Sequence, residues 1–154
     1  MMIAMQSVVF LRANPIDPDP RVEKEAKTLA LAGWKVTAVG WDRTGQLPTK
    51  VETPYFVIHR LGPKAQFGTG LRNLSKLLVW QWYLFVWLWQ HRRSFSHIHA
   101  ADLDTALPAL FMKYLTGKYF IYDIYDFFAV SRKGPPLLKK IARWLELRVI
   151  NRAD

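Results

Sequence analysis

Three groups of polar side chains, each placed at the end of an apolar run, are the part of this sequence that could do chemistry. The groups are Arg12, Asn14, Asp17, Asp19 and Arg21, then His99, Asp102 and Asp104, and then Asp123, Tyr125 and Asp126. A histidine or a carboxylate can move a proton or hold a substrate hydroxyl. An arginine or an amide can hold an anionic oxygen, such as that of a phosphate. Together the groups predict a site for a polar substrate with some negative charge.

Several of these residues also have a purely structural interpretation, which the sequence leaves open. Asp19 and Asp102 each precede a helical pattern, so both could serve only as N-caps. His99 could be a core histidine whose ring nitrogens are satisfied, and Asp123 and Asp126 could be ordinary solvated loop residues.

The elements that must position these groups alternate between strands and helices. Strands are expected at Ser7–Leu11, Lys35–Trp41, Phe56–Leu61, His97–Ala100 and Tyr119–Asp123, and helices between Asp19 and Gly33, and at Leu71–Arg93, Leu103–Leu115 and Leu137–Asn151. The last helix should bury one apolar face, made of Leu138, Ile141, Leu145 and Val149.

This order predicts a single α/β domain over residues 1–154, with a Rossmann-like, doubly wound parallel sheet. In such sheets ligands bind beyond the carboxyl ends of the strands, near the point where the strand order reverses. We therefore expect the three polar groups to gather at one edge of the sheet.

Several site classes are excluded by what the sequence lacks. It has no cysteine, which excludes disulfides and thiolate metal sites. The loop after the first strand has no glycine, whereas a dinucleotide fingerprint needs glycines for close approach of the pyrophosphate. P-loop, His-Glu-x-x-His and Gly-x-Ser-x-Gly motifs are also absent.

The helix expected at 71–93 is rich in tryptophan, in a chain with a formal net charge of +10. Such a helix, with basic neighbours, could lie on an anionic membrane surface, and the residues expected to make that contact are Trp80, Trp87, Arg92 and Arg93. The alternative is a helix packed in the core or against a partner. A nucleic-acid role is not expected, because no DNA-binding motif or RNA-binding pattern of stacking aromatics is present.

Motifs spread along the chain resemble the amino-terminal domain of family 4 glycosyltransferases, which have the GT-B fold. The matching segments are Asp19–Ala26 followed by Leu29, Gly33 and Val36, then Ile98–Ala109, then Gly117-Lys118 with Tyr122-Asp123, and finally Leu145-Glu146 with Arg152–Asp154. Two positions depart from the family pattern. Ala101 replaces a second histidine, and Tyr125 replaces the histidine of an aspartate, any residue, histidine, glutamate segment. Tyrosine can donate a hydrogen bond, but it does not exchange a proton near neutral pH as histidine does.

The resemblance implies the acceptor-binding half of a retaining glycosyltransferase, with a nucleotide-sugar as donor substrate, no metal and no other cofactor. The acceptor would be a glycan or a lipid-linked molecule. His99, Asp102 and Asp126 would be the catalytic residues, and Asn14, Arg21, Asp123 and Tyr125 would bind substrate.

The resemblance also implies a carboxy-terminal donor domain, which would be supplied beyond Asp154 or by a separate subunit. We therefore expect this chain to be inactive by itself, and to be cytoplasmic, with possible peripheral contact at the inner face of the membrane. The rival hypothesis is a non-enzymatic basic α/β module that docks on a membrane or a partner subunit.

Overall fold

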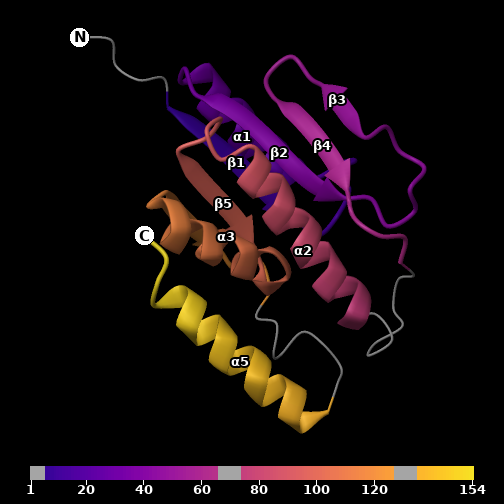
Figure 1. Cartoon of the computed structure of the whole chain (residues 1–154). Coiled ribbons are helices and arrows are strands. Elements are labelled where there is room, and N and C mark those ends of the chain that lie inside the picture. The colour runs from indigo at the N-terminus through magenta and orange to yellow at the C-terminus, as the bar shows by residue number, and fades with distance from the viewer. Residues whose placement is uncertain (1–5, 66–73, 127–134) are drawn as a thin grey trace.

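The computed structural model describes residues 6–65, 74–126 and 135–154, and these residues form a mixed sheet flanked by helices (Figure 1). The strands are β1 (Ser7–Arg12), β2 (Lys35–Trp41), β3 (Lys50–Glu52), β4 (Val57–Leu61), β5 (His97–Ala101) and β6 (Tyr119–Asp123). The helices are α1 (Pro20–Leu31), α2 (Leu74–Gln90), α3 (Leu103–Thr116) and α5 (Pro136–Ile150).

The sheet has the strand order β3-β4-β2-β1-β5-β6, and its central pairs are parallel, as the alternation of strands and helices predicts. From β1 the chain proceeds to β2 and β4 on one side, and α2 then leads it back to β5 on the other side of β1. The strand order therefore reverses between β1 and β5. The expected Rossmann-like α/β class is confirmed.

Strand β3 was not predicted, and it pairs antiparallel with β4 at the edge of the sheet. Its three residues, Lys50, Val51 and Glu52, contain one apolar side chain and so carry almost no hydrophobic pattern. The strand exists because its backbone hydrogen-bonds to β4, and sequence periodicity does not report such pairing.

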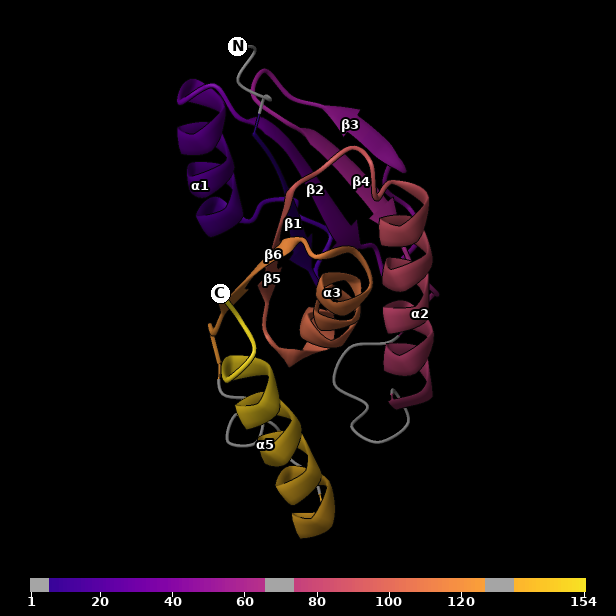
Figure 2. The same ribbon diagram turned by 60° about the vertical axis from the view of Figure 1, so that its left-hand side comes forward.

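Helices cover both faces of the sheet, with α1 on one face and α2, α3 and α5 on the other (Figures 1 and 2). Beneath α1, the buried side chains of Val22 and Ala26 pack with Phe10, Val36 and Ala38 of β1 and β2. The other face carries the larger core, in which side chains from α2, α3 and α5 meet the sheet. Strand β1 contributes to both cores, with Val8 and Phe10 on the side of α1 and Val9 and Leu11 on the other side.

Helix α5 buries the expected apolar face in part, since Val149 is buried and Leu145 packs against the larger core. Its buried residues are Ala142, Glu146 and Val149, whereas Ile141 is 45% exposed. Glu146 is fully buried and accepts a hydrogen bond of 3.2 Å from the hydroxyl of Tyr122. The apolar pattern alone did not predict the burial of Glu146, because charged side chains are rarely buried unless they are paired.

Candidate functional site

The carboxyl ends of β1, β5 and β6 lie next to one another at the point where the strand order reverses. Leu11 of β1 is in register with Ala100 of β5, and Ala101 of β5 is in register with Asp123 of β6. Each strand is followed by one of the three polar groups. The sheet therefore brings these groups to one edge, as expected for a ligand site of this fold class.

Arg12, the last residue of β1, joins two of the polar groups. Its Nε donates to Asp19 Oδ2 at 2.7 Å, and its Nη1 lies 3.5 Å from Asp102 Oδ2. Asn14 Nδ2 donates to the same Asp19 oxygen at 2.8 Å, while Asn14 Oδ1 accepts from the backbone N–H of Ile16 at 2.9 Å. This network fixes the loop between β1 and α1.

Asp19 is both an N-cap of α1 and a member of this network. Its Oδ1 accepts from the backbone N–H of Val22 at 3.3 Å, which confirms the capping interpretation. Burial by itself raises the pKa of Asp19, but hydrogen bonds from Asn14 and Arg12 outweigh burial and hold the pKa below its usual value.

Asp102 stands at the N-cap position of α3 but its side chain makes no capping hydrogen bond. Instead, its Oδ1 accepts from the backbone N–H groups of Tyr125 at 2.8 Å and Asp126 at 3.1 Å. Its backbone has φ 62° and ψ 164°, a conformation that costs a non-glycine residue about 1–3 kcal/mol. Asp102 thus ties the loop after β6 to the end of β5, and the fold holds it there against backbone strain.

The ring of Tyr125 lies between two guanidinium groups. Arg12 is 4.2 Å and Arg21 is 3.8 Å from the ring centroid. Burial raises the pKa of Tyr125 to about 12, so its hydroxyl stays protonated at neutral pH. Arg21 is an exposed residue, whereas the side chain of Arg12 is 15% exposed.

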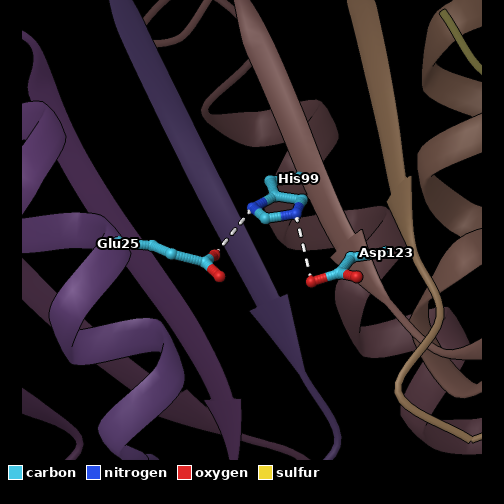
Figure 3. Close-up of side chains that lie close together, drawn as sticks. All are labelled: Glu25, His99 and Asp123. Atoms are coloured by element: carbon cyan, nitrogen blue, oxygen red, sulfur yellow. Dashed lines mark ion pairs between the residues drawn. The ribbon is translucent and has the colours of Figure 1, made fainter.

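His99 lies between two carboxylates that come from different elements (Figure 3). Its Nδ1 is 3.6 Å from Glu25 Oε2 of α1, and its Nε2 is 3.8 Å from Asp123 Oδ2 of β6. The ring packs edge-on against Phe10, with centroids 4.7 Å apart. Burial lowers the pKa of His99, and the opposing effect of Asp123 does not restore it. Burial also raises the pKa of Glu25, and Asp123 raises it further.

The structure thus brings six of the seven predicted site residues together through their side chains or rings. They are His99, Asp102, Asn14, Arg21, Asp123 and Tyr125. Asp126, the seventh, joins through its backbone N–H, and the residue is exposed. These placements do not test the roles assigned to the residues, which remain predictions.

Sequence reasoning assigned no role to Glu25, and it named Arg12 without giving it one. A signal for Glu25 was present, because Arg21 and Glu25 are four residues apart and therefore share one face of α1. The signal for Arg12 was its position directly after the first expected strand, and the structure extends β1 to include it. Neither signal identifies the partner, which comes from a different part of the chain.

The four residues predicted to contact a membrane differ in their exposure to solvent. Trp80 was wrongly placed on the surface, because it is fully buried and stacks on Trp41 with ring centroids 5.2 Å apart. Trp87 is half-buried and packs against the larger core. Arg93 is exposed, and Arg92 lies over the ring of Trp89 at 4.5 Å.

The exposed apolar face of α2 contains other residues. They are Leu74, Leu78, Val79, Trp82, Tyr83 and Trp89. Their spacing corresponds to one side of a helix, opposite the buried Trp80, Leu84 and Leu88. None of the helices in residues 6–65, 74–126 and 135–154 has the length and hydropathy needed to cross a bilayer.

Comparison with known proteins identifies the fold. No protein-family model and no curated protein matches the chain in sequence. Among solved structures, a sucrose-phosphate synthase from Thermosynechococcus elongatus matches 97% of this chain with a TM-score of 0.75 and 13% identity. A second structure of that synthase matches 97% of the chain with a TM-score of 0.71 and 14% identity.

The chain spans 41% of the first synthase chain and 74% of the second. Likeness at this level of identity establishes the architecture alone, which is a Rossmann-like α/β fold.

Proposed function

We propose that this chain is the acceptor-binding half of a retaining, nucleotide-sugar-dependent glycosyltransferase that acts on a glycan or lipid-linked acceptor. The observation that carries the proposal is the position of Asp102 and Asp123 at the carboxyl edge of the sheet, next to the reversal of strand order, with His99 two residues before the end of β5. The fold shared with a sucrose-phosphate synthase supports it. In this proposal the donor domain lies elsewhere in the protein or on another subunit.

The chemistry of the site suits a hydroxyl-bearing acceptor. Carboxylates accept hydrogen bonds from sugar hydroxyls, and a neutral imidazole can either donate or accept one. His99 and Asp102 would contact the acceptor hydroxyl, while Asp123, Tyr125 and Asp126 would line the same edge.

The leaving nucleoside diphosphate is anionic, and it needs positive partners in the transition state. Arg21 suits this role because its guanidinium lies at the exposed end of the Tyr125 stack. Asn14 would act by shaping the loop, since its amide already bonds to Asp19 and to the backbone of Ile16. Arg12 would position Asp102 through their 3.5 Å contact.

The direct test is sugar transfer by a protein that contains this chain together with its donor domain. We expect His99→Ala and Asp102→Ala each to lower kcat/KM by about 100-fold or more, because both touch the reacting hydroxyl in this proposal. Asp126→Ala should have a smaller effect, since Asp102 binds the backbone of Asp126 rather than its side chain. Asp17→Ala is the matched control, because Asp17 is an exposed carboxylate on the loop after β1.

Unchanged turnover in all three site variants would refute the assignment of the site. Retention of the anomeric configuration, read by NMR of the product, and activity in the presence of a chelator would test the retaining and metal-independent parts of the proposal separately.

A second candidate function is favoured by the exposed apolar face of α2. Trp82 is 63% exposed and Leu78 is 62% exposed, and Lys76 and Arg93 flank this face. An exposed aromatic helix with basic neighbours suits the interface of an anionic membrane. The chain would then be a cytoplasmic module that docks on the inner membrane face, with or without transferase activity. Vesicle binding together with no sugar transfer in the complete protein would favour this candidate over the first.

A further inference from the structure

The Glu25, His99 and Asp123 side chains form a cluster whose donor atoms lie within 4.8 Å of one another. The three residues come from α1, β5 and the end of β6, so the tertiary fold assembles the cluster (Figure 3). One carboxylate faces each nitrogen of the imidazole ring, at 3.6 Å for Glu25 and 3.8 Å for Asp123.

Neither of these two contacts is a hydrogen bond, because both exceed the usual N···O distance by several tenths of an ångström. A neutral imidazole carries a single N–H, so one of the two carboxylates must face a ring nitrogen that has only a lone pair. That pairing of two acceptors is repulsive unless a proton or a metal cation lies between them.

The Glu25 side of the ring has the unmet acceptor. Glu25 Oε2 is fully buried and accepts no hydrogen bond from the residues that the structure describes. A buried carboxylate oxygen without a donor costs free energy, and a bound cation would satisfy it.

Neither of the two arginines that act electrostatically on Glu25 donates a hydrogen bond to its Oε2. Arg12 is held by Asp19 and Asp102, and the guanidinium groups of both Arg12 and Arg21 stack on Tyr125. With a neutral imidazole, the cluster presents a ring lone pair and carboxylate oxygens to a small cation.

We infer that Glu25 and His99 Nδ1 bind a divalent transition-metal ion of the zinc class, with Asp123 accepting the N–H of His99 Nε2. Metal-binding histidines commonly donate their second ring N–H to a carboxylate, and this arrangement places a carboxylate on each side of the ring. Zinc binds imidazole nitrogen and carboxylate oxygen at about 2.0–2.2 Å. A tetrahedral ion at such bond lengths holds its ligand atoms about 3.3–3.5 Å apart. The observed 3.6 Å between Nδ1 and Oε2 needs a closure of a few tenths of an ångström.

The donor set also selects the class of metal. Magnesium and calcium prefer sites made of oxygen ligands, whereas imidazole suits zinc and its neighbours in the first transition series. Two protein ligands leave the remaining coordination positions to water or to a substrate hydroxyl. Such an ion would occupy the acceptor side of the proposed active site, so we expect added zinc to compete with acceptor rather than to support transfer.

The test is zinc binding to the purified chain, measured by isothermal titration calorimetry with the metal ion alone. We expect one saturable site in the parent protein. Glu25→Gln and Asp123→Asn should each weaken binding by at least about tenfold. Glu23→Gln is the matched control, because Glu23 also lies on α1 but its carboxylate faces the backbone of Asp19.

The chain has other histidines that could bind zinc, so the ligand must be identified. His59 and His91 lie near each other, with ring centroids 6.1 Å apart. His91→Gln should therefore leave the measured site intact. Nitrogen-15 NMR of the imidazoles should show the zinc-induced shift at Nδ1 of His99, and circular dichroism should show that each variant remains folded.

Two results would overturn the inference: dissociation constants weaker than about 1 mM in the parent protein, or equal zinc affinity in the parent protein and the Glu25→Gln variant. Neither result would bear on sugar transfer, since the proposed transfer does not use this ion. The metal-site inference and the proposed function can therefore be refuted separately.

Discussion

Arg12 is the residue on which the geometry of the candidate site depends most. It links Asp19, on the loop before α1, to Asp102, at the end of β5, and it covers one face of the Tyr125 ring. Its side chain is 15% exposed, so these contacts are only partly screened by water. A single strand-end arginine therefore connects the loops that follow β1, β5 and β6.

Removal of this arginine should destabilise the fold as well as the site. We expect Arg12→Ala to lower the free energy of unfolding by about 2–4 kcal/mol, because it leaves the buried Asp19 carboxylate without its cation. Urea denaturation followed by circular dichroism measures this change. Arg21→Ala is the control, and it should cost less than about 1 kcal/mol because Arg21 is exposed. Equal losses in the two variants would show that the link to Asp19 contributes nothing.

Asp42 provides a pH-dependent prediction at the same edge of the sheet. Its carboxylate follows β2 and accepts hydrogen bonds from the Thr44 hydroxyl at 2.7 Å and from the backbone N–H groups of Thr44 and Leu47, each at 2.9 Å. Burial opposes ionisation, but these hydrogen bonds outweigh it and lower the pKa of Asp42 from 3.8 to about 2. A carboxyl whose pKa is lowered by folding stabilises the folded state above pH 3.8, and that stability is lost as the pH falls through about 2.

Asp42→Asn should therefore lower the free energy of unfolding by about 1–3 kcal/mol at neutral pH, since the amide replaces one acceptor oxygen with a donor. The cost should shrink as the pH is lowered from 4 towards 2, because the unfolded parent chain protonates Asp42 near pH 3.8 while the folded protein keeps the carboxylate ionised down to about pH 2. Thermal or urea unfolding at several pH values measures it. Asp17→Asn, at an exposed position, should change little at any pH. A cost that stays constant down to pH 2 would contradict the assigned pKa.

At the residue scale, the sequence predicted which residues gather at the site better than it predicted which side chains they contact. The strand-end rule identified His99, Asp102 and Asp123, because residues at the ends of parallel strands meet wherever the strands pair. The sequence could not predict that Glu25 faces His99, since that contact depends on how α1 crosses β1 and β5. Such long-range side-chain pairing leaves no periodic signal in one sequence.

At the element scale, the position of the loop after β1 depends on a glycine in the neighbouring strand. Gly40 of β2 lies directly under this loop, and a Cβ atom there would be 2.6 Å from the backbone oxygen of Asn14. The same oxygen accepts the backbone N–H of Trp41 at 2.8 Å. The loop can approach the strand this closely only because residue 40 has no side chain.

Gly40→Ala should therefore push the loop away from β2 and destabilise the protein by about 1–3 kcal/mol. Gly33→Ala is a matched comparison, because Gly33 has φ 87° but no atom within 4 Å of an added Cβ. We expect Gly33→Ala to cost only backbone strain, about 1–2 kcal/mol. NMR shifts at Asn14 and Asp19 separate the two variants, because Gly40→Ala should move these signals and Gly33→Ala should not. Undisturbed signals in Gly40→Ala would mean that the loop tolerates the extra methyl group.

The elements also show where periodicity is informative and where it is not. The bounds of β2 and β6 match the prediction, because both are dense apolar runs ended by polar residues. The burial of α2 was harder to predict, since nearly all of its positions are apolar and the pattern cannot separate the core face from the exposed face. Trp80 and Trp82 are therefore equivalent in the sequence but opposite in the fold.

At the scale of the whole molecule, charge and apolar surface are unevenly distributed, and this distribution indicates which surfaces and ligands the protein attracts. The chain has a net charge of +10, whereas the candidate site gathers Asp19, Glu25, Asp102 and Asp123 around two arginines. The positive charge must therefore lie mainly outside the site. An anionic surface would be attracted to the molecule as a whole, while the site would hold neutral or mixed-charge ligands.

Vesicle binding tests whether α2 is the contact surface. We expect the chain to bind vesicles that contain an anionic phospholipid and not zwitterionic vesicles, with binding that weakens as salt screens charges beyond about 10 Å. Trp82→Ala should reduce the bound fraction in a pelleting assay several-fold without loss of stability, because Trp82 is 63% exposed. Trp144→Ala is the matched control, since Trp144 is an exposed tryptophan on α5 with Arg148 over its ring at 4.8 Å.

Trp80→Ala separates membrane contact from packing in the same helix. Its burial against Trp41 predicts a loss of about 3–5 kcal/mol in unfolding free energy. If Trp144→Ala lowers vesicle binding as much as Trp82→Ala does, the attraction is diffuse and α2 has no special role. If only Trp82→Ala lowers it, the apolar face of α2 is the surface that contacts the lipid, because loss of an exposed tryptophan then matters on α2 and not on α5.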